Sequence, residues 1–232
     1  MGKRLRTQRR GEGSPNYRSP SFRHLAPGRH PQIREGTGKV MDILHAPGRS
    51  TPLMLVDFGG QKEYLIAAEG SFVDQEIAVG QEAPIERGNI MPVGSIPEGT
   101  LIYNIELKPG DLGKLVKTAG TSATVISHGT ETTVQLPSGG FKRINNRCYA
   151  AIGVPAGSGR IDRPYAKAGK KYHALSSKAK THIKVSGVSM NPVNHPFGGG
   201  SHPHVGRPST VPRGARPGQK VGRLSPQRKK KE

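Results

Sequence analysis

Three histidines near the end of the chain are the first candidates for chemistry. His195 lies between Asn194 and Pro196, and His202 and His204 follow. A general base usually has a neighbour that orients its ring, and no carboxylate stands within a few positions of His195. The i, i+2 pair without a nearby Cys, Asp or Glu poorly matches a zinc site. We therefore predict no enzyme and no metal site, while catalysis by His195 stays the alternative.

The glycines beside His195 do not form a nucleotide-binding loop. Gly198, Gly199 and Gly200 lack the spacing of a phosphate-cradling motif, and no Lys-Ser or Lys-Thr pair follows them. Together with two prolines they exclude a helix or a central strand. Residues 187–200 are thus predicted to form a loop whose backbone lies against another surface. Cys148, the single cysteine, excludes an intramolecular disulfide and a cysteine-rich zinc site.

Positive charge is the most pronounced property of the sequence. The net charge is +20, from 36 Lys and Arg against 16 Asp and Glu. Residues 1–30 hold eight basic residues and one acidic, and residues 180–232 hold eleven and one, whereas residues 31–105 hold five and ten. A compact fold would suffer self-repulsion from this excess, so a polyanionic partner is indicated. The basic ends could also be a solvated tail or a localisation signal.

Arginines spread along extended Gly- and Pro-containing segments favour RNA as that partner. Arg binds phosphates through paired hydrogen bonds, and Gly lets the backbone approach closely. Each cation can then meet a different phosphate between RNA helices. The predicted RNA-contacting residues are Lys3, Arg4, Arg6, Arg9, Arg10, Arg18, Arg23, Arg29, Lys142, Arg143, Arg147, Lys167, Lys170, Lys171, Lys178, Lys180, Lys184, Asn191, His195, Gly198, Gly199, Gly200, Arg207, Arg213 and Arg216.

Only the middle of the chain has the apolar alternation needed to fold and to position these residues. Short apolar runs lie at 40–44, 53–58, 64–66 and 76–79, and the pair Gly59-Gly60 predicts a tight hairpin turn. A second set lies at 101–107, 114–117, 123–127, 132–136 and 148–152, between Gly and Pro turns. We predict a mainly β protein with two small barrels.

The two ends lack the composition of a folded domain. The hydrophobic share of the whole chain is 32%, with 32 Gly and 20 Pro, and few apolar residues lie in the ends. They cannot offset a backbone entropy cost of about 1–2 kcal/mol per residue and should become ordered only against a partner. No apolar run is long enough for a membrane span or a signal peptide, so a cytosolic protein is expected.

The string GVSMNPVNHPFGGG at 187–200 resembles the signature of the large-subunit ribosomal protein two family, in its archaeal form. Further matches are Asn104-Ile105-Glu106, the segment 119–123, the segment 136–139 and the segment 147–153, in the family's order. The resemblance covers essentially the whole chain. Two positions depart from the bacterial pattern: Asn194 replaces an acidic residue and Phe197 replaces a second His, the latter as is usual in archaea and eukaryotes.

The resemblance implies an OB-type barrel followed by an SH3-like barrel with long irregular basic extensions. The domains would be an extension at 1–35, the OB-type barrel at 36–88, the SH3-like barrel at 89–165 and an extension at 166–232 that contains the loop 187–200. It also implies binding to large-subunit ribosomal RNA, neighbouring ribosomal proteins and the small subunit, in the ribosome of the cytoplasm. His195 would lie closest to the peptidyl-transferase centre.

The resemblance further implies support of subunit association, tRNA binding and the peptidyl-transferase centre, without membrane binding or a homo-oligomer. No cofactor is expected beyond RNA-associated ions such as magnesium. Asn194 is at odds with any mechanism that needs an acid–His pair. Two other classes stay open on the residues: direct catalysis by His195 in peptidyl transfer, and a free RNA chaperone or transcription-associated barrel protein.

Overall fold

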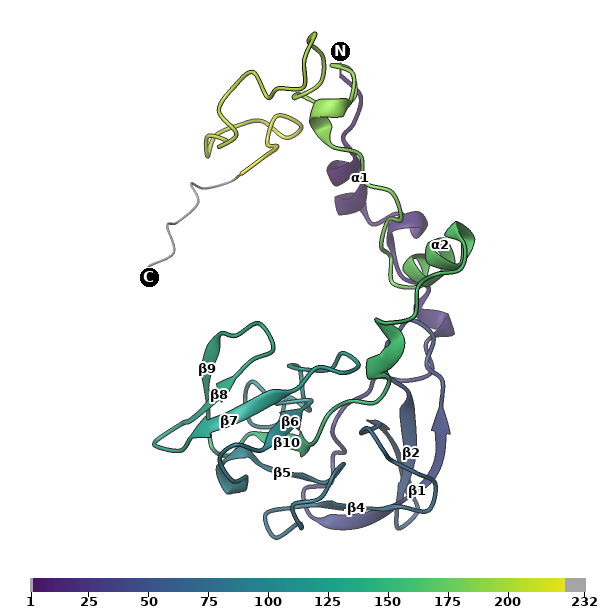
Figure 1. Ribbon diagram of the computed structural model, residues 1–232, viewed down its shortest axis with the longest axis vertical. Coiled ribbons are helices and arrows are strands. Elements are labelled where there is room, and N and C mark those ends of the chain that lie inside the picture. Colours follow the sequence, from purple (N-terminus) through teal and green to yellow (C-terminus); the bar gives the residue numbers. More distant parts are fainter. Residues whose placement is uncertain (1, 224–232) are drawn as a thin grey trace. The chain divides into compact units, whose positions relative to one another are not determined.

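The chain forms two compact units in the computed structural model, which describes residues 2–223 (Figure 1). The sheet unit comprises residues 21–166, and the tail unit comprises residues 1–20 and 167–232. The last nine residues of the predicted C-terminal extension, 224–232, lie outside the described residues. The two ends of the chain, which are far apart in sequence, therefore belong to one unit.

The first half of the sheet unit is an antiparallel set of four strands. They are β1 (Gly36–Leu44), β2 (Leu53–Phe58), β3 (Gln61–Ile66) and β4 (Glu76–Val79), and β1 pairs with both β2 and β4. The predicted hairpin between β2 and β3 is confirmed, with Phe58 paired to Gln61 and positive φ angles of 63° at Gly59 and 101° at Gly60. Glycine tolerates both angles without steric cost.

The second half continues the same sheet with six shorter strands. They are β5 (Ile90–Pro92), β6 (Leu101–Tyr103), β7 (Ala123–Ser127), β8 (Thr132–Gln135), β9 (Phe141–Ile144) and β10 (Tyr149–Ile152). The order across the sheet is β3-β2-β1-β4-β5-β10-β6-β7-β8-β9. The β4–β5 pair is parallel and joins the two halves, while the other pairs are antiparallel. The prediction of a mainly β protein is confirmed.

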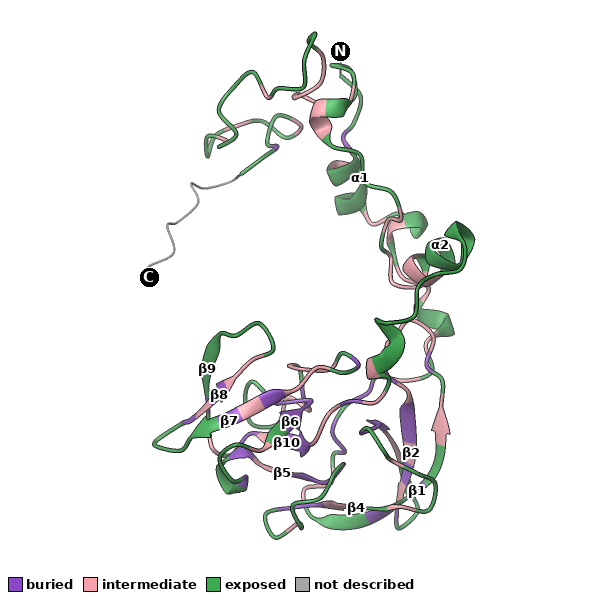
Figure 2. Ribbon diagram, viewed as in Figure 1, coloured by how far each residue is buried: buried purple, intermediate pink, exposed green. Residues whose placement is uncertain are grey.

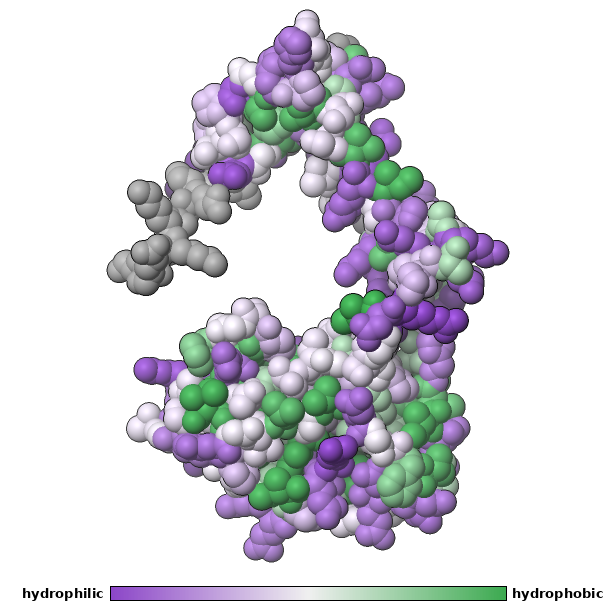
Figure 3. Space-filling view, viewed as in Figure 1, coloured by the Kyte–Doolittle hydropathy of each residue, from purple (hydrophilic) through white to green (hydrophobic). Residues whose placement is uncertain are grey.

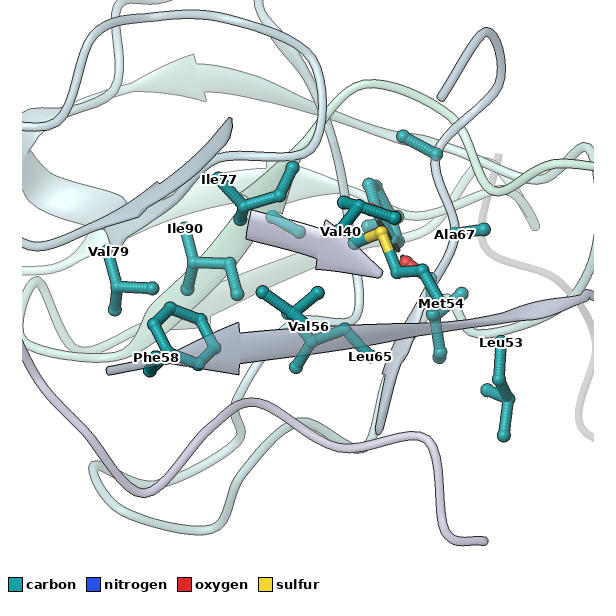
Figure 4. Close-up of a cluster of buried hydrophobic side chains, with 14 of the residues drawn as sticks. Val40, Leu53, Met54, Val56, Phe58, Leu65, Ala67, Ile77, Val79 and Ile90 are labelled. Atoms are coloured by element: carbon teal, nitrogen blue, oxygen red, sulfur yellow. Dashed lines mark hydrogen bonds between the residues drawn. The ribbon is translucent and has the colours of Figure 1, made fainter. Parts of the chain in front are cut away.

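Two separate hydrophobic clusters stabilise the sheet unit. Val40, Val56 and Ile77 lie in the first, which takes most of its members from β1 to β4 and also includes Ile90, Tyr103 and Ala151 of the second half (Figure 4). Val125 and Ile144 lie in the second, on β7 and β9. Side chains alternate between buried and half-buried along β8 and from Met54 onward along β2, as period-two packing requires. Each fully buried aliphatic side chain contributes roughly 1.5–3 kcal/mol, so these clusters are the main source of stability.

Buried polar groups fix the loops at the centre of the sheet unit. The Glu106 carboxylate has no exposed surface and accepts hydrogen bonds from the backbone N–H groups of Gly110 (3.2 Å), Leu112 (3.1 Å) and Tyr149 (3.0 Å). Its Oε1 atom also lies 3.4 Å from the guanidinium of Arg34. A buried carboxylate held by this many donors ties the 106–112 loop to β10 and to the segment that leads into β1.

The sequence prediction failed at several strands of the second half. Residues 114–117 form no strand, because Val116 has a φ of +51° and Leu115 makes only an isolated bridge to Ile105. The run at 101–107 is a strand only to Tyr103, since Asn104 has a φ of +50°. Strands β5 and β9 were not predicted, because β5 is three residues long and β9 is mostly exposed.

The tail unit contains two short helices and almost no buried hydrophobic surface. Helix α1 spans Arg6–Glu12 and helix α2 spans Ala168–Ser176. Among its described residues only Leu5 and Val221 are buried hydrophobics. Figure 2 shows α1 and α2 mostly in the colour of exposed residues. None of the helices in residues 2–223 is long and apolar enough to cross a membrane. Short 3-10 turns complete the chain at Pro15–Tyr17, Ser21–Arg23, Val93–Ser95, Ser158–Arg160 and Gly187–Ser189.

Candidate nucleic-acid interface

Positive charge is concentrated in the tail unit. Residues 2–20 hold six Lys and Arg and residues 167–223 hold eleven, against a single acidic residue, Glu12. The sheet unit is nearly balanced, with fifteen basic and fourteen acidic residues. All predicted basic contacts of the tail unit are exposed except Lys178, which is half-buried. Hydrophilic side chains accordingly gather over α1 and α2 in Figure 3.

The N-terminal arm, residues 2–12, packs against the C-terminal part of the same unit. The backbone N–H of Lys3 donates to the carbonyl of Val193 at 2.7 Å. From α1, Arg6 donates to the carbonyl of Ile183 at 3.3 Å and Arg10 donates to Thr181 Oγ1 at 3.0 Å. The purple and green segments run beside each other in Figure 1. Sequence reasoning did not predict this pairing, since no local signal connects segments about 180 positions apart.

The predicted loop 187–200 is a compact series of turns. After the 3-10 turn Gly187–Ser189, the carbonyl of Asn191 accepts from the N–H groups of Asn194 (2.9 Å) and His195 (3.2 Å). The carbonyl of His195 accepts from Gly198 at 2.9 Å, and that of Met190 accepts from Gly199 at 3.1 Å. These bonds close the loop on itself, so its backbone has a defined shape before any partner is considered.

The glycines of this loop have internal reasons for being glycine. A Cβ at Gly187 would collide with the imidazole ring of His195, and one at Gly198 would collide with the Met190 carbonyl. Gly199 has a φ of +88°, and a Cβ there would lie 2.6 Å from Cγ of Pro192. Sequence reasoning attributed Gly198 to Gly200 to close approach of an external surface. The structure adds that close packing inside the loop already requires two of them.

His195 is held as a neutral side chain. It is half-buried, its Nδ1 accepts a hydrogen bond from the Phe197 N–H at 3.0 Å, and its ring makes an edge contact with the Phe197 ring at 5.1 Å. Desolvation by burial lowers the pKa of His195 below its usual value. With Nδ1 engaged as an acceptor, the proton of the neutral ring resides on Nε2, which is left as a hydrogen-bond donor.

Two cavities meet at His195, and both lie within the tail unit. The first has a volume of about 360 Å³ and is bounded by Lys3, Leu5, Val193 and Gly218 among others. The second has a volume of about 500 Å³ and is bounded by α1 and by residues of the 184–195 segment. His195 lines both. The predicted contact residues Arg4, Arg6, Arg9, Arg10, Lys184 and His195 are therefore brought together around the second cavity.

The other tail residues are not gathered at this place. Lys170 and Lys171 lie on the exposed surface of α2, with Lys167 at its N-cap and Lys178 and Lys180 beyond its end. Arg207, Arg213 and Arg216 belong to the 207–223 segment, which is closed by a bridge between Thr210 and Arg223. Within residues 2–223 no three His, Cys, Asp or Glu side chains are grouped to hold a metal ion. Arg18 follows the 3-10 turn Pro15–Tyr17 and lines neither cavity.

The sheet unit carries five predicted contact residues at dispersed positions. Lys142 and Arg143 lie on β9, the edge strand, beside the exposed ring of Phe141. Arg147 is in the turn that leads into β10, and Arg23 and Arg29 precede β1; all five are exposed. An exposed aromatic ring beside two cations on a sheet edge provides both a stacking surface for a base and hydrogen-bond donors for a phosphate.

Sequence reasoning missed a cationic cluster formed by Arg29, Arg49 and Lys117. Burial and the charges of Arg49 and Arg29 lower the pKa of Lys117 to about 8, although Asp111 acts in the opposite direction. Burial and Arg29 also lower the pKa of Arg49. Arg49 is anchored to the Ala26 carbonyl at 3.1 Å and Lys117 to the Gly113 carbonyl at 3.0 Å. Three cations held close together repel one another, so the cluster favours binding of an anion. The sequence did not reveal it, because only the fold brings these three segments together.

Known proteins match along the whole chain. A family model described as Ribosomal Proteins L2, C-terminal domain, matches residues 86–220. The large ribosomal subunit protein uL2 of Picrophilus torridus is 53% identical over 232 residues, which cover 100% of this chain and 99% of that protein. The uL2 protein of Thermoplasma acidophilum is 51% identical (99% and 98% covered), and that of Methanothermobacter thermautotrophicus is 48% identical (98% and 98%).

Proposed function

Because the chain belongs to the uL2 family of large ribosomal subunit proteins, in its archaeal type, we propose that it is a structural constituent of the large subunit that binds ribosomal RNA. Membership confirms the resemblance carried by residues 187–200. The observation that supports RNA binding best is the charge of the tail unit: seventeen described cations meet one acid, with two buried hydrophobic residues. A surface of this kind needs phosphates as counter-charges.

The finer assignment follows the family and the placement of the contact residues. We propose an OB-type barrel at 36–88 and an SH3-like barrel at 89–165, with basic extensions at 1–35 and 166–232. The second hydrophobic cluster supports this division, since all its buried members lie at 91–152, whereas the first also takes in Ile90, Tyr103 and Ala151. The extensions would thread into large-subunit RNA, with no cofactor beyond RNA-associated ions such as magnesium. The protein would work in cytoplasmic ribosomes, next to other ribosomal proteins and the small subunit, and would support subunit association, tRNA binding and the peptidyl-transferase centre.

His195 has a positional role in this proposal and is not a catalyst. A general base needs a free lone pair aimed at the proton that it removes. Nδ1 of His195 already accepts the Phe197 N–H, and the neutral ring keeps its proton on Nε2. The neighbouring side chain is Asn194, which cannot stabilise an imidazolium as a carboxylate does. These groups support hydrogen bonding and packing at the loop, without an acid–His pair.

Binding to large subunits and its dependence on salt test the proposal. The protein should sediment with large subunits after a high-salt wash, which separates a subunit constituent from a free RNA chaperone. For isolated ribosomal RNA, log K against log salt should fall with a slope of about −0.7 to −0.9 for each phosphate neutralised. A chain that stays in the supernatant, or an affinity that does not change with salt, would reject the proposal.

A further inference from the structure

The lining of the second cavity of the tail unit combines two chemically different kinds of side chain. It includes the cations Arg4, Arg6, Arg9, Arg10 and Lys184. Among the described residues only Arg4 of these five is paired with a carboxylate, that of Glu12. Arg6 and Arg10 each use one nitrogen on the neighbouring segment and keep further N–H donors. Arg6 and Arg10 are therefore anchored to the neighbouring segment, and the cations of the lining are largely without a counter-charge.

The lining also includes apolar groups, most of which come from the 184–195 segment. These are Val185, Met190 and Leu5, together with the imidazole of His195. The His195 ring is packed against Gly187 and the Phe197 ring, so its position is determined by the loop. The side chain of Val185 is 47% exposed. The phosphates on the outside of an RNA duplex need only a charged surface to bind. They therefore do not account for apolar groups inside a cationic cavity.

From this lining we infer that the cavity between α1 and the 184–195 segment holds one unstacked nucleotide of the RNA. This inference rests on the proposed RNA-binding function and specifies its mode at one place. The phosphate would lie on the Arg and Lys side chains, and the base would lie against Val185, Met190 and the His195 ring. A cavity of about 500 Å³ is in the range that holds a small ligand, roughly 300–1,000 Å³. Unstacked bases are commonly held by ring and apolar side chains beside cations.

Ultraviolet crosslinking in assembled large subunits tests the site, because it joins bases directly to the side chains that touch them. After nuclease and protease digestion, the wild-type peptide that contains residues 184–195 should carry a single-nucleotide adduct. The variant Val185→Glu should reduce that adduct by about tenfold or more, because a carboxylate in the lining repels the phosphate. The control is Val193→Glu: Val193 is also 47% exposed but lines only the first cavity. It should leave the adduct within about twofold.

The outcomes separate this inference from the proposed function. If the wild-type protein enters large subunits and the 184–195 peptide carries no adduct while other tail peptides do, the nucleotide site is wrong and RNA binding stands. Equal adducts in the wild type and both variants would also overturn it, since the base would then lie elsewhere on the peptide. If the wild-type protein does not enter large subunits, the proposed function itself has failed.

Discussion

The sheet unit and the tail unit differ in charge balance and in the amount of hydrophobic surface that they bury. The sheet unit nearly balances its charges and buries two hydrophobic clusters, so the contacts that hold it lie within the unit. The tail unit has hydrogen-bonded turns and two short helices, but its described residues bury only Leu5 and Val221 among hydrophobics. We therefore expect the sheet unit to fold alone and the tail unit to be stabilised by its RNA partner.

Hydrogen exchange on the RNA-free protein should show the largest difference between the units. Strands of the sheet unit should exchange only by global opening, which for a domain stable by about 5 kcal/mol slows exchange by more than roughly 10³-fold. Amides in residues 2–20 and 205–223 should exchange close to the unprotected rate, because little apolar burial opposes opening. We also expect the two protected segments to lie at about 36–88 and 90–165.

Addition of large-subunit RNA is the matched condition for that experiment. RNA should slow exchange in the tail unit much more than in the sheet unit. Strong protection of residues 2–20 without RNA would mean that the arm and the loop 187–200 already form a stable module. Coupled folding would then be wrong for this unit, although RNA binding would not be.

The next largest effect should come from removing the buried carboxylate of the sheet unit. Glu106→Ala leaves the N–H groups of Gly110, Leu112 and Tyr149 without their acceptor and Arg34 without its partner. Breaking a buried pair of this kind costs about 3–5 kcal/mol of unfolding free energy. Urea unfolding of the RNA-free protein, followed by circular dichroism, measures it.

Lys39→Ala is the control for that loss. Lys39 pairs with Asp74 at 2.8 Å on the surface, where solvent screens the interaction, so the unfolding midpoint should hardly move. If Glu106→Ala were as mild as Lys39→Ala, the sheet unit would not depend on its internal polar network. The contrast between an internally and an externally stabilised unit would then be weaker than the structure indicates.

The sequence predicted well wherever a local rule was sufficient. The Gly59-Gly60 turn and the strands β1 to β4 follow from alternation and turn chemistry alone. The residues at 114–117 look like a strand by alternation, but the positive φ of Val116 and the anchoring of Lys117 to Gly113 are set by tertiary packing. The sequence also did not predict the cluster of Arg29, Arg49 and Lys117, because no local pattern connects positions so far apart.

The candidate site shows the same division. The sequence identified the loop 187–200 and most of the cations around His195, because each is visible as a residue type. It did not reveal that the N-terminal arm packs on that loop, which depends on bonds such as Lys3 to Val193. Nor could it indicate which ring nitrogen of His195 is engaged, because that depends on the Phe197 backbone.

The smallest effect should come from His195 itself, if the loop acts by its shape. His195→Gln keeps a hydrogen-bonding group and should lower the rate of single-turnover peptide transfer in assembled subunits by less than about threefold. Loss of a general base would lower that rate by about 10²–10⁴-fold.

Gly199→Val should impair assembly more than His195→Gln does, because the φ of +88° at this position disfavours a β-branched residue and Pro192 leaves no room for Cβ. Gly214→Val is the control, since a Cβ there meets nothing within 4 Å. Burial lowers the pKa of His195, so the ring is neutral well above pH 6.5, and wild-type and Gln rates should have the same pH dependence there. Normal assembly with a collapsed, pH-independent rate in His195→Gln, beside a tolerated Gly199→Val, would show that the imidazole reacts.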